Sequence, residues 1–159
     1  MKKLFILLFI ILSGLITIPS NLNPLSENHG AWYDMHTGEI HCYDKWSCLH
    51  ESVHKYDWEN GSGQISATKG FHKAVTEFDI KVSEIPLENR TFIESFIYDF
   101  PGVGNEFKED GWGGHHELYA ELFRYYQLGY DMPNEFVQFY DKEAIYKIWE
   151  QYPNFWSRL

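Results

Sequence analysis

The sequence predicts an α+β domain that is mainly α-helical, with one small β-hairpin packed beside a bundle of helices. Two observations lead to this prediction. Apolar residues recur at helical spacing in several segments, whereas the alternation typical of a strand is confined to one stretch near residue 40. The chain of 159 residues matches the usual size of one domain, and its 44% of hydrophobic residues can form a core.

Residues 1–20 have the composition of a targeting segment. Lys2 and Lys3 precede an apolar run over residues 4–18, which is close to the length of a signal-peptide core and short for a membrane-spanning helix. Ser20 gives only a weak cleavage pattern. A signal peptide that is removed and an N-terminal membrane anchor that is kept therefore both stay open.

The next ten residues, 21–30, hold Pro24 and several Asn and Ser without an apolar period, so they are expected to be a tether. Residues 31–159 are expected to form the folded domain. In either case for residues 1–20, the protein is predicted to be secreted or anchored at the outer face of the cytoplasmic membrane.

The first elements of the domain are a hairpin and a helix. Residues 31–44 alternate around a turn at residues 36–39, His-Thr-Gly-Glu, which predicts a β-hairpin. Residues 46–58 are predicted to be helical, with Asp44 or Ser47 as the N-cap. The sequence Asn-Gly-Ser-Gly at residues 60–63 is expected to end this helix.

Apolar residues at helical spacing predict a second helix over residues 67–83 and a third over residues 87–100, which Pro86 would begin. The second helix is expected to bury Phe71, Val75, Phe78 and Val82. The third is expected to turn Phe92, Ile93, Phe96 and Ile97 inward.

Residues 101–114 are rich in glycine and predict a loop of the kind that borders active sites. A fourth helix is predicted over residues 115–128 and is ended by Gly129. Two short helices, over residues 133–140 and 142–151, are expected to close the domain.

The most informative motif lies in the first helix. His50, Glu51 and His54 form the pattern His-Glu-x-x-His. Histidines four residues apart leave the same face of a helix, where both imidazoles can bind one tetrahedral zinc ion. Glu51 lies beside them, where it can reach a water on the metal without being a ligand. This is the arrangement of zinc metallopeptidases.

A second acidic pair completes the predicted site. Glu117 and Glu121 are four residues apart in the fourth helix, so they share one face and repel each other unless a positive group compensates. Two histidines and one glutamate are a ligand set of catalytic zinc sites, with one position left for water. Glu117 is therefore the expected third ligand. Glu121 is expected to accept a hydrogen bond from His50 or His54.

Other zinc and hydrolase patterns are excluded. No glycine and third histidine follow His54 at the metzincin spacing. The sequence has no Cys-x-x-Cys, which excludes deaminase and zinc-ribbon sites. Cys48 lacks the flanking glycines of a nucleophile elbow.

The two histidines followed by Glu-x-x-x-Glu resemble the gluzincins, the thermolysin-like division of zinc peptidases. The stretch from Glu117 to Tyr126, ELYAELFRYY, resembles the third-ligand helix of the anthrax lethal factor catalytic domain and the related Pro-Pro endopeptidases. The resemblance implies a zincin-like bundle of helices, Glu117 as third ligand, Glu51 as base, and a hairpin edge that binds an extended peptide. That family has a tyrosine seven residues before its ligand glutamate, where this sequence has Asp110.

These residues predict an extracytoplasmic, zinc-dependent metalloendopeptidase with one catalytic Zn²⁺. Zinc would acidify water and polarise the scissile carbonyl, and Glu51 would carry a proton from that water to the leaving amine. The tetrahedral oxyanion needs a further donor. His115 is the preferred donor because it follows two glycines at the start of a helix. The alternatives that stay open are His116, Tyr119, Tyr125 and Tyr98.

The expected partner is a peptide or protein substrate. Thirteen Lys and Arg against 23 Asp and Glu give a net charge of −10, which argues against nucleic-acid binding. A zinc-stabilised binding or adaptor domain without turnover is the alternative function. An extracytoplasmic location also permits a disulfide between Cys42 and Cys48, although two reduced cysteines stay open. The sequence does not predict the oligomeric state.

Overall fold

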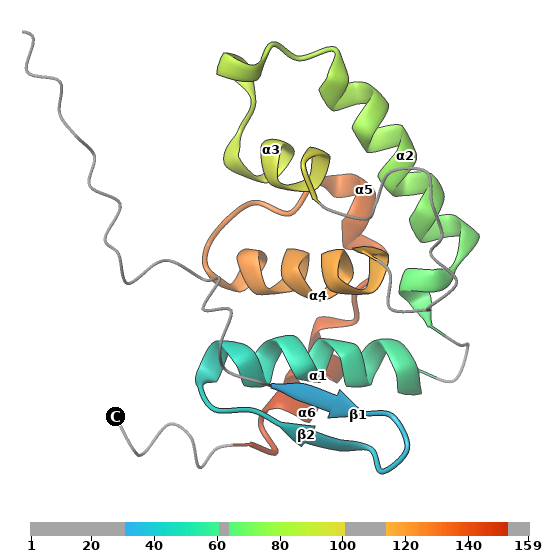
Figure 1. The fold of residues 1–159 in the computed structure, drawn as a ribbon, viewed down its shortest axis with the longest axis vertical. Coiled ribbons are helices and arrows are strands. Elements are labelled where there is room, and N and C mark those ends of the chain that lie inside the picture. The colour runs from blue at the N-terminus through green and yellow to red at the C-terminus, as the bar shows by residue number, and fades with distance from the viewer. Residues whose placement is uncertain (1–30, 61–63, 101–113, 153–159) are drawn as a thin grey trace, which may run out of the picture.

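The structure is a computed structural model that describes residues 31–60, 64–100 and 114–152. The predicted targeting segment and tether, and most of the predicted glycine-rich loop, lie outside these residues. Figure 1 shows a mainly helical domain with one two-stranded antiparallel sheet, which confirms the predicted fold class at this level. None of the helices in the described ranges has both the length and the apolar character needed to cross a bilayer.

The described elements follow one another along the chain without a repeat. They are β1 (Trp32–Asp34), β2 (Glu39–His41), α1 (Lys45–Glu59), η2 (Ile65–Ala67), α2 (Lys69–Ser83), η3 (Leu87–Asn89), α3 (Phe92–Tyr98), α4 (Gly114–Gln127), α5 (Asn134–Val137) and α6 (Lys142–Trp149).

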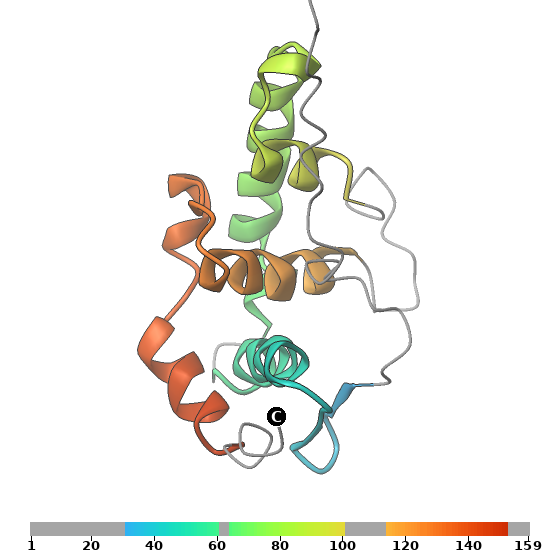
Figure 2. The ribbon, with the colours of Figure 1, turned by 90° about the vertical axis from the view of Figure 1, so that its left-hand side faces the viewer.

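Helix α1 occupies the middle of the lower half of the molecule. In Figures 1 and 2 it lies between the hairpin and α4, and α6 packs along another of its sides. Helices α2 and α3 pack against each other beyond α4. Because α1 and α4 are in direct contact, two segments about 60 residues apart in sequence face each other across one interface.

The hairpin is short, and its turn is built from local hydrogen bonds. Tyr33 pairs with Ile40, and the backbone N–H of Gly38 donates to the carbonyl of Asp34 at 2.7 Å. The Asp34 carboxylate accepts from the N–H of His36 at 2.8 Å, which is typical of an Asx turn. Gly38 has φ +74°, a conformation that residues with a Cβ rarely adopt.

The predicted start of α1 is confirmed, and Asp44, one of the two residues proposed as N-cap, is the N-cap. The Asp44 side chain accepts hydrogen bonds from the N–H groups of Trp46 and Ser47, and the Ser47 hydroxyl accepts from the N–H of Asp44. This reciprocal capping box satisfies N–H groups that have no partner inside the helix. Asn60 is the C-cap residue.

A disulfide joins the hairpin to α1. Cys42 follows β2, Cys48 lies in the first turns of α1, and the two form the bond that the sequence permits. Both cysteines are buried, and Ile40 packs with them in a small core of their own. The hairpin is held to α1 at a second point, where the Tyr33 hydroxyl donates to Glu59 at 3.1 Å.

Replacing both Cys42 and Cys48 with Ser is expected to lower the free energy of unfolding by about 2 kcal/mol, since the bond closes a loop with a sequence separation of 6. Urea unfolding of the variant and of the wild-type protein measures the difference. Wild-type protein unfolded with a reductant present should lose the same amount. A loss below about 0.5 kcal/mol would show that the disulfide adds no more than an ordinary surface contact.

The predicted third helix is wrong in its extent. The chain forms a single 3₁₀ turn at Leu87–Asn89, leaves the helical conformation, and begins α3 only at Phe92. Thr91 and Glu94 form a capping box, with the Thr91 N–H donating to the Glu94 carboxylate at 2.7 Å, and this box starts a new helix. The late start turns Phe92 outward, where it is 49% exposed, while Ile93 and Ile97 are buried as expected.

The remaining helices agree with the sequence in place and type. Helix α4 spans Gly114–Gln127 and is followed by Gly129 with φ +95°. The main core lies between α1, α2, α3 and α4, and α5 and α6 close it. Its largest fully buried side chains are Tyr119, Phe71, Phe78, Phe123 and Phe136. This packing holds the facing surfaces of α1 and α4, on which the predicted zinc ligands lie, in a fixed relation.

Candidate metal centre

Helix α1 presents three polar residues along one face. His50, His54 and Asp57 are spaced at i, i+4 and i+7, so their side chains leave the same side of the helix. That side faces the cavity and the first turn of α4. The adjacent side carries Leu49 and Val53, which are fully buried in the main core.

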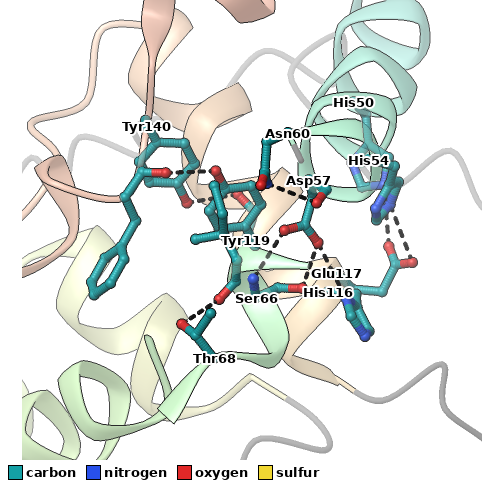
Figure 3. Close-up of polar contacts among 12 residues, drawn as sticks. His50, His54, Asp57, Asn60, Ser66, Thr68, His116, Glu117, Tyr119 and Tyr140 are labelled. Carbon is teal, nitrogen blue, oxygen red and sulfur yellow. Dashed lines mark hydrogen bonds and ion pairs between the residues drawn. The ribbon is translucent and has the colours of Figure 1, made fainter. Parts of the chain in front are cut away.

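The structure brings His50, His54 and Glu117 together. The Nε2 atoms of the two histidines are 2.9 Å apart. The Glu117 carboxylate lies 3.1 Å from Nε2 of His50 and 3.4 Å from Nε2 of His54. Figure 3 shows the carboxylate of Glu117, from α4, pointing toward the two imidazoles of α1.

These separations fit a tetrahedral metal ion. Ligand atoms about 2.0–2.1 Å from zinc in a tetrahedron are about 3.3–3.4 Å from one another. One ligand atom from each of the three residues lies within 4.8 Å of the others, and the closest pairs are within half an ångström of that edge. Zinc binds imidazole nitrogens and carboxylates, whereas calcium and magnesium prefer oxygen ligands. Two imidazole nitrogens and one carboxylate therefore favour zinc over calcium or magnesium.

Glu121 holds His50 from the other side of its ring. The Glu121 carboxylate lies 2.9 Å from Nδ1 of His50, one helical turn beyond Glu117 on α4. Arg124 in turn donates to Glu121, with its Nε 3.0 Å from the carboxylate. Glu121 therefore lies behind the ring, on the side away from Glu117, which is the position from which a carboxylate orients a metal-binding histidine.

The electrostatics follow from this arrangement. Burial alone would lower the pKa of His50, but its contacts with Glu117 and Glu121 outweigh burial and raise that pKa to about 10. Burial likewise would raise the pKa of Glu117, and its hydrogen bonds with His50 and His54 instead hold it well below its usual range. Because zinc binds neutral imidazole, metal uptake at this site would release the proton of His50.

Glu51 lies beside the triad without joining it. Its side chain is buried at 6% exposure, and burial raises the pKa of its carboxyl group, which the neighbouring His50 and His54 partly oppose. The backbone N–H of Tyr33 in β1 also acts to lower this pKa. A carboxyl group with a raised pKa, held at the wall of a cavity, is suited to taking up and releasing a proton.

His50, Glu51, His54 and Glu117 line one cavity of about 760 Å³ between the hairpin, α1 and the start of α4. Its apolar lining residues include Trp32, Met35 and Trp58. Its polar lining residues are His50, Glu51, His54, Asp57, Gln64, His116 and Glu117. A space of this size and mixed character matches the usual binding site for a small molecule or a peptide segment.

The structure does not place His115, the preferred oxyanion donor, at this cavity. Its ring stacks on His72 at 4.0 Å between centroids and meets Phe71 edge-on, so it lies with α2. Burial, followed by the nearby His72 and His116, lowers the pKa of His115 to about 4. Its neighbour His116 does line the cavity, because one step along a helix turns a side chain by about 100°.

Sequence reasoning missed Asp57 and Ser66, which contact His116. Both are buried, and Nδ1 of His116 lies 3.3 Å from Asp57 Oδ2 and within hydrogen-bond distance of the Ser66 hydroxyl. The spacing of Asp57 from His50 and His54 along one helix face is a signal that could have identified it. No comparable signal marks Ser66, which belongs to a short 3₁₀ turn.

Comparison of the chain with family models, with curated proteins and with solved structures finds no match.

Proposed function

We propose that this protein is a zinc-dependent metallopeptidase of the gluzincin type that hydrolyses peptide bonds. The observation that carries the proposal is the convergence of His50, His54 and Glu117 in one cavity with the buried carboxyl group of Glu51. A zinc-binding cluster alone would support any metal-stabilised fold. The free acid beside it is what favours hydrolysis.

His50, His54 and Glu117 would hold the metal, and Glu121 would keep the His50 ring in place. Zinc in such a site supplies Lewis acidity, which lowers the pKa of water toward about 7 and polarises a carbonyl group. Glu51 takes a proton from the attacking water on its carboxylate and passes it to the nitrogen of the leaving amine. Its side chain is buried and lines the cavity.

The hairpin gives the cavity a wall suited to an extended peptide. Strand β1 pairs with β2 along one side, and residues of β1 line the cavity along the other. A substrate strand can hydrogen-bond to such an edge, while its side chains meet the apolar surface of Trp32, Met35 and Trp58. The arrangement favours a peptide over a small polar metabolite as substrate.

Incubation of zinc-loaded protein with a peptide library and with unfolded casein tests the proposal. We expect cleavage that 1,10-phenanthroline blocks and that added zinc restores. Mass spectrometry of the fragments would identify the cleaved bonds. Tight zinc binding without cleavage of any peptide would contradict the peptidase proposal and support a zinc-stabilised binding domain instead.

A further inference from the structure

Another pocket is lined by residues of α2, α3 and the segment that leads into α5, and it shares no lining residue with the cavity of the metal centre. Figure 1 shows α3 on the other side of α4 from α1, which carries both histidines of the triad. This α2–α3 pocket has a volume of about 340 Å³. Its apolar lining includes Phe78 and Ile93, which are 1% and 6% exposed, and the half-buried Met132. Apolar atoms of a partner that enter this space would be removed from water.

The charged residues of the α2–α3 pocket are mostly acidic. Glu94, Asp131 and Glu135 line it together with Lys81, so three negative charges and one positive charge give a formal charge of −2. The Nζ atom of Lys81 donates to the Glu135 carboxylate at 2.9 Å, which pairs these two charges. Asp131 is exposed, and within the described ranges no hydrogen bond or ion pair engages its carboxylate. The pocket therefore presents a carboxylate that a cationic group from outside can reach.

Two exposed aromatic side chains border the α2–α3 pocket along the chain. Phe92 lies between two lining residues of α3 and is 49% exposed, and Tyr130 directly precedes Asp131 and is 39% exposed. Their rings are in contact, with 4.9 Å between centroids. The capping box at the start of α3 explains how Phe92 comes to point outward, but its exposure adds nothing to the core. Exposed apolar side chains in contact with each other are typical of an interaction surface.

We propose that the α2–α3 pocket and the Phe92–Tyr130 pair bind a basic peptide segment of another protein, with a lysine or arginine side chain in the pocket. The apolar stem of that side chain packs on Phe78 and Ile93, and its charged end reaches Asp131. A neighbouring cation of the segment lies over the Phe92 or Tyr130 ring. A purely apolar segment would leave the acidic side chains without a counter-charge, so a basic segment fits this surface best.

The net charge of the whole chain supports the same partner. At −10, the protein attracts cationic peptides and repels anionic ones over a distance, which raises the rate of encounter. The proposal goes beyond the peptidase function and does not depend on it, because none of these residues lines the cavity of the metal centre. The surface would bind its partner whether or not the protein cleaves it.

Fluorescence anisotropy with a labelled octapeptide of alternating lysine and leucine tests the proposal. The full chain carries Glu51→Gln, so that the proposed peptidase activity does not consume the probe. We expect saturable binding that weakens as the NaCl concentration rises. A peptide with acetylated lysines keeps the length of the side chains but loses their charge, and it should bind at least about fivefold more weakly.

Variants of the protein locate the binding surface. Asp131→Lys should weaken binding of the lysine peptide by at least about fivefold, because it removes an attraction and adds a repulsion. Glu143→Lys changes the net charge equally in the exposed first turn of α6 and should weaken binding by less than about twofold. Phe92→Ala should weaken binding by about 2–5-fold, whereas Tyr43→Ala, which alters another exposed aromatic residue, should not. Circular dichroism checks that each variant is folded.

A charge exchange separates direct contact from a structural effect. A peptide in which glutamate replaces each lysine should bind better to the Asp131→Lys protein than to the protein with Asp131, which a disturbed fold would not produce. Equal losses in Asp131→Lys and Glu143→Lys would reveal only a general attraction to an acidic protein and would overturn the proposal. So would equal affinities for the acetylated and unmodified peptides, or binding to phosphatidylcholine vesicles that depends on Phe92 while the lysine peptide does not bind.

Discussion

Replacing Glu51 with Gln is expected to reduce hydrolysis by at least about 10²–10⁴-fold while zinc stays bound. The amide has nearly the shape of the carboxyl group but cannot accept the proton of the attacking water. Glu51 is not among the three residues whose ligand atoms converge, so the metal should be unaffected. Single-turnover kinetics and elemental analysis of the same sample measure both quantities.

Glu77→Gln is the matched control for this change. Glu77 is exposed on α2, 3.6 Å from Lys73, and is not among the residues that line the cavity. The control should keep both activity and metal. Turnover near the wild-type rate in zinc-replete Glu51→Gln protein would remove Glu51 from the role of base.

Removing a predicted zinc ligand is expected to weaken zinc binding. His50→Ala, His54→Ala and Glu117→Ala should each lose most of the zinc affinity, because each deletes one of three donors. Glu121→Ala should weaken zinc binding or activity by about 10–100-fold, since Glu121 orients His50 without binding the ion. His116→Ala should keep the metal. Calorimetric titration of zinc into the apo variants measures their zinc affinities and ranks these losses.

Glu143→Ala, in the exposed first turn of α6, controls for the loss of one acidic side chain. It should titrate like the wild-type protein. If His116→Ala loses more zinc affinity than Glu117→Ala, then the third ligand has been wrongly assigned.

Local sequence signals predicted most of the helices because each signal acts within a few residues. Asp44 and Ser47 were the two cap residues considered, and they form the box at the start of α1 together. The prediction for residues 87–100 was wrong because two local signals compete there. Pro86 and the apolar spacing favour one helix, whereas the box of Thr91 and Glu94 starts another, and the box determines where α3 begins.

The site residues could likewise be predicted from the sequence only where the signal is local. Spacing within α1 and within α4 placed each pair of side chains on one face, which needs only the helical period. Which face of α4 meets α1, and hence whether His115 or His116 lines the cavity, depends on packing between distant segments. The contact of Ser66 with His116 joins residues 50 apart and could not be predicted from either one alone.

A crystal structure of the zinc-loaded protein, with anomalous data at the zinc absorption edge, tests the central claim most directly. We expect one anomalous peak in the cavity, about 2.0–2.1 Å from Nε2 of His50 and of His54 and about 2.0–2.2 Å from the Glu117 carboxylate, with a position left open toward Glu51. A cavity without a peak at saturating zinc, or a peak held by other residues, would contradict the assignment of this metal centre.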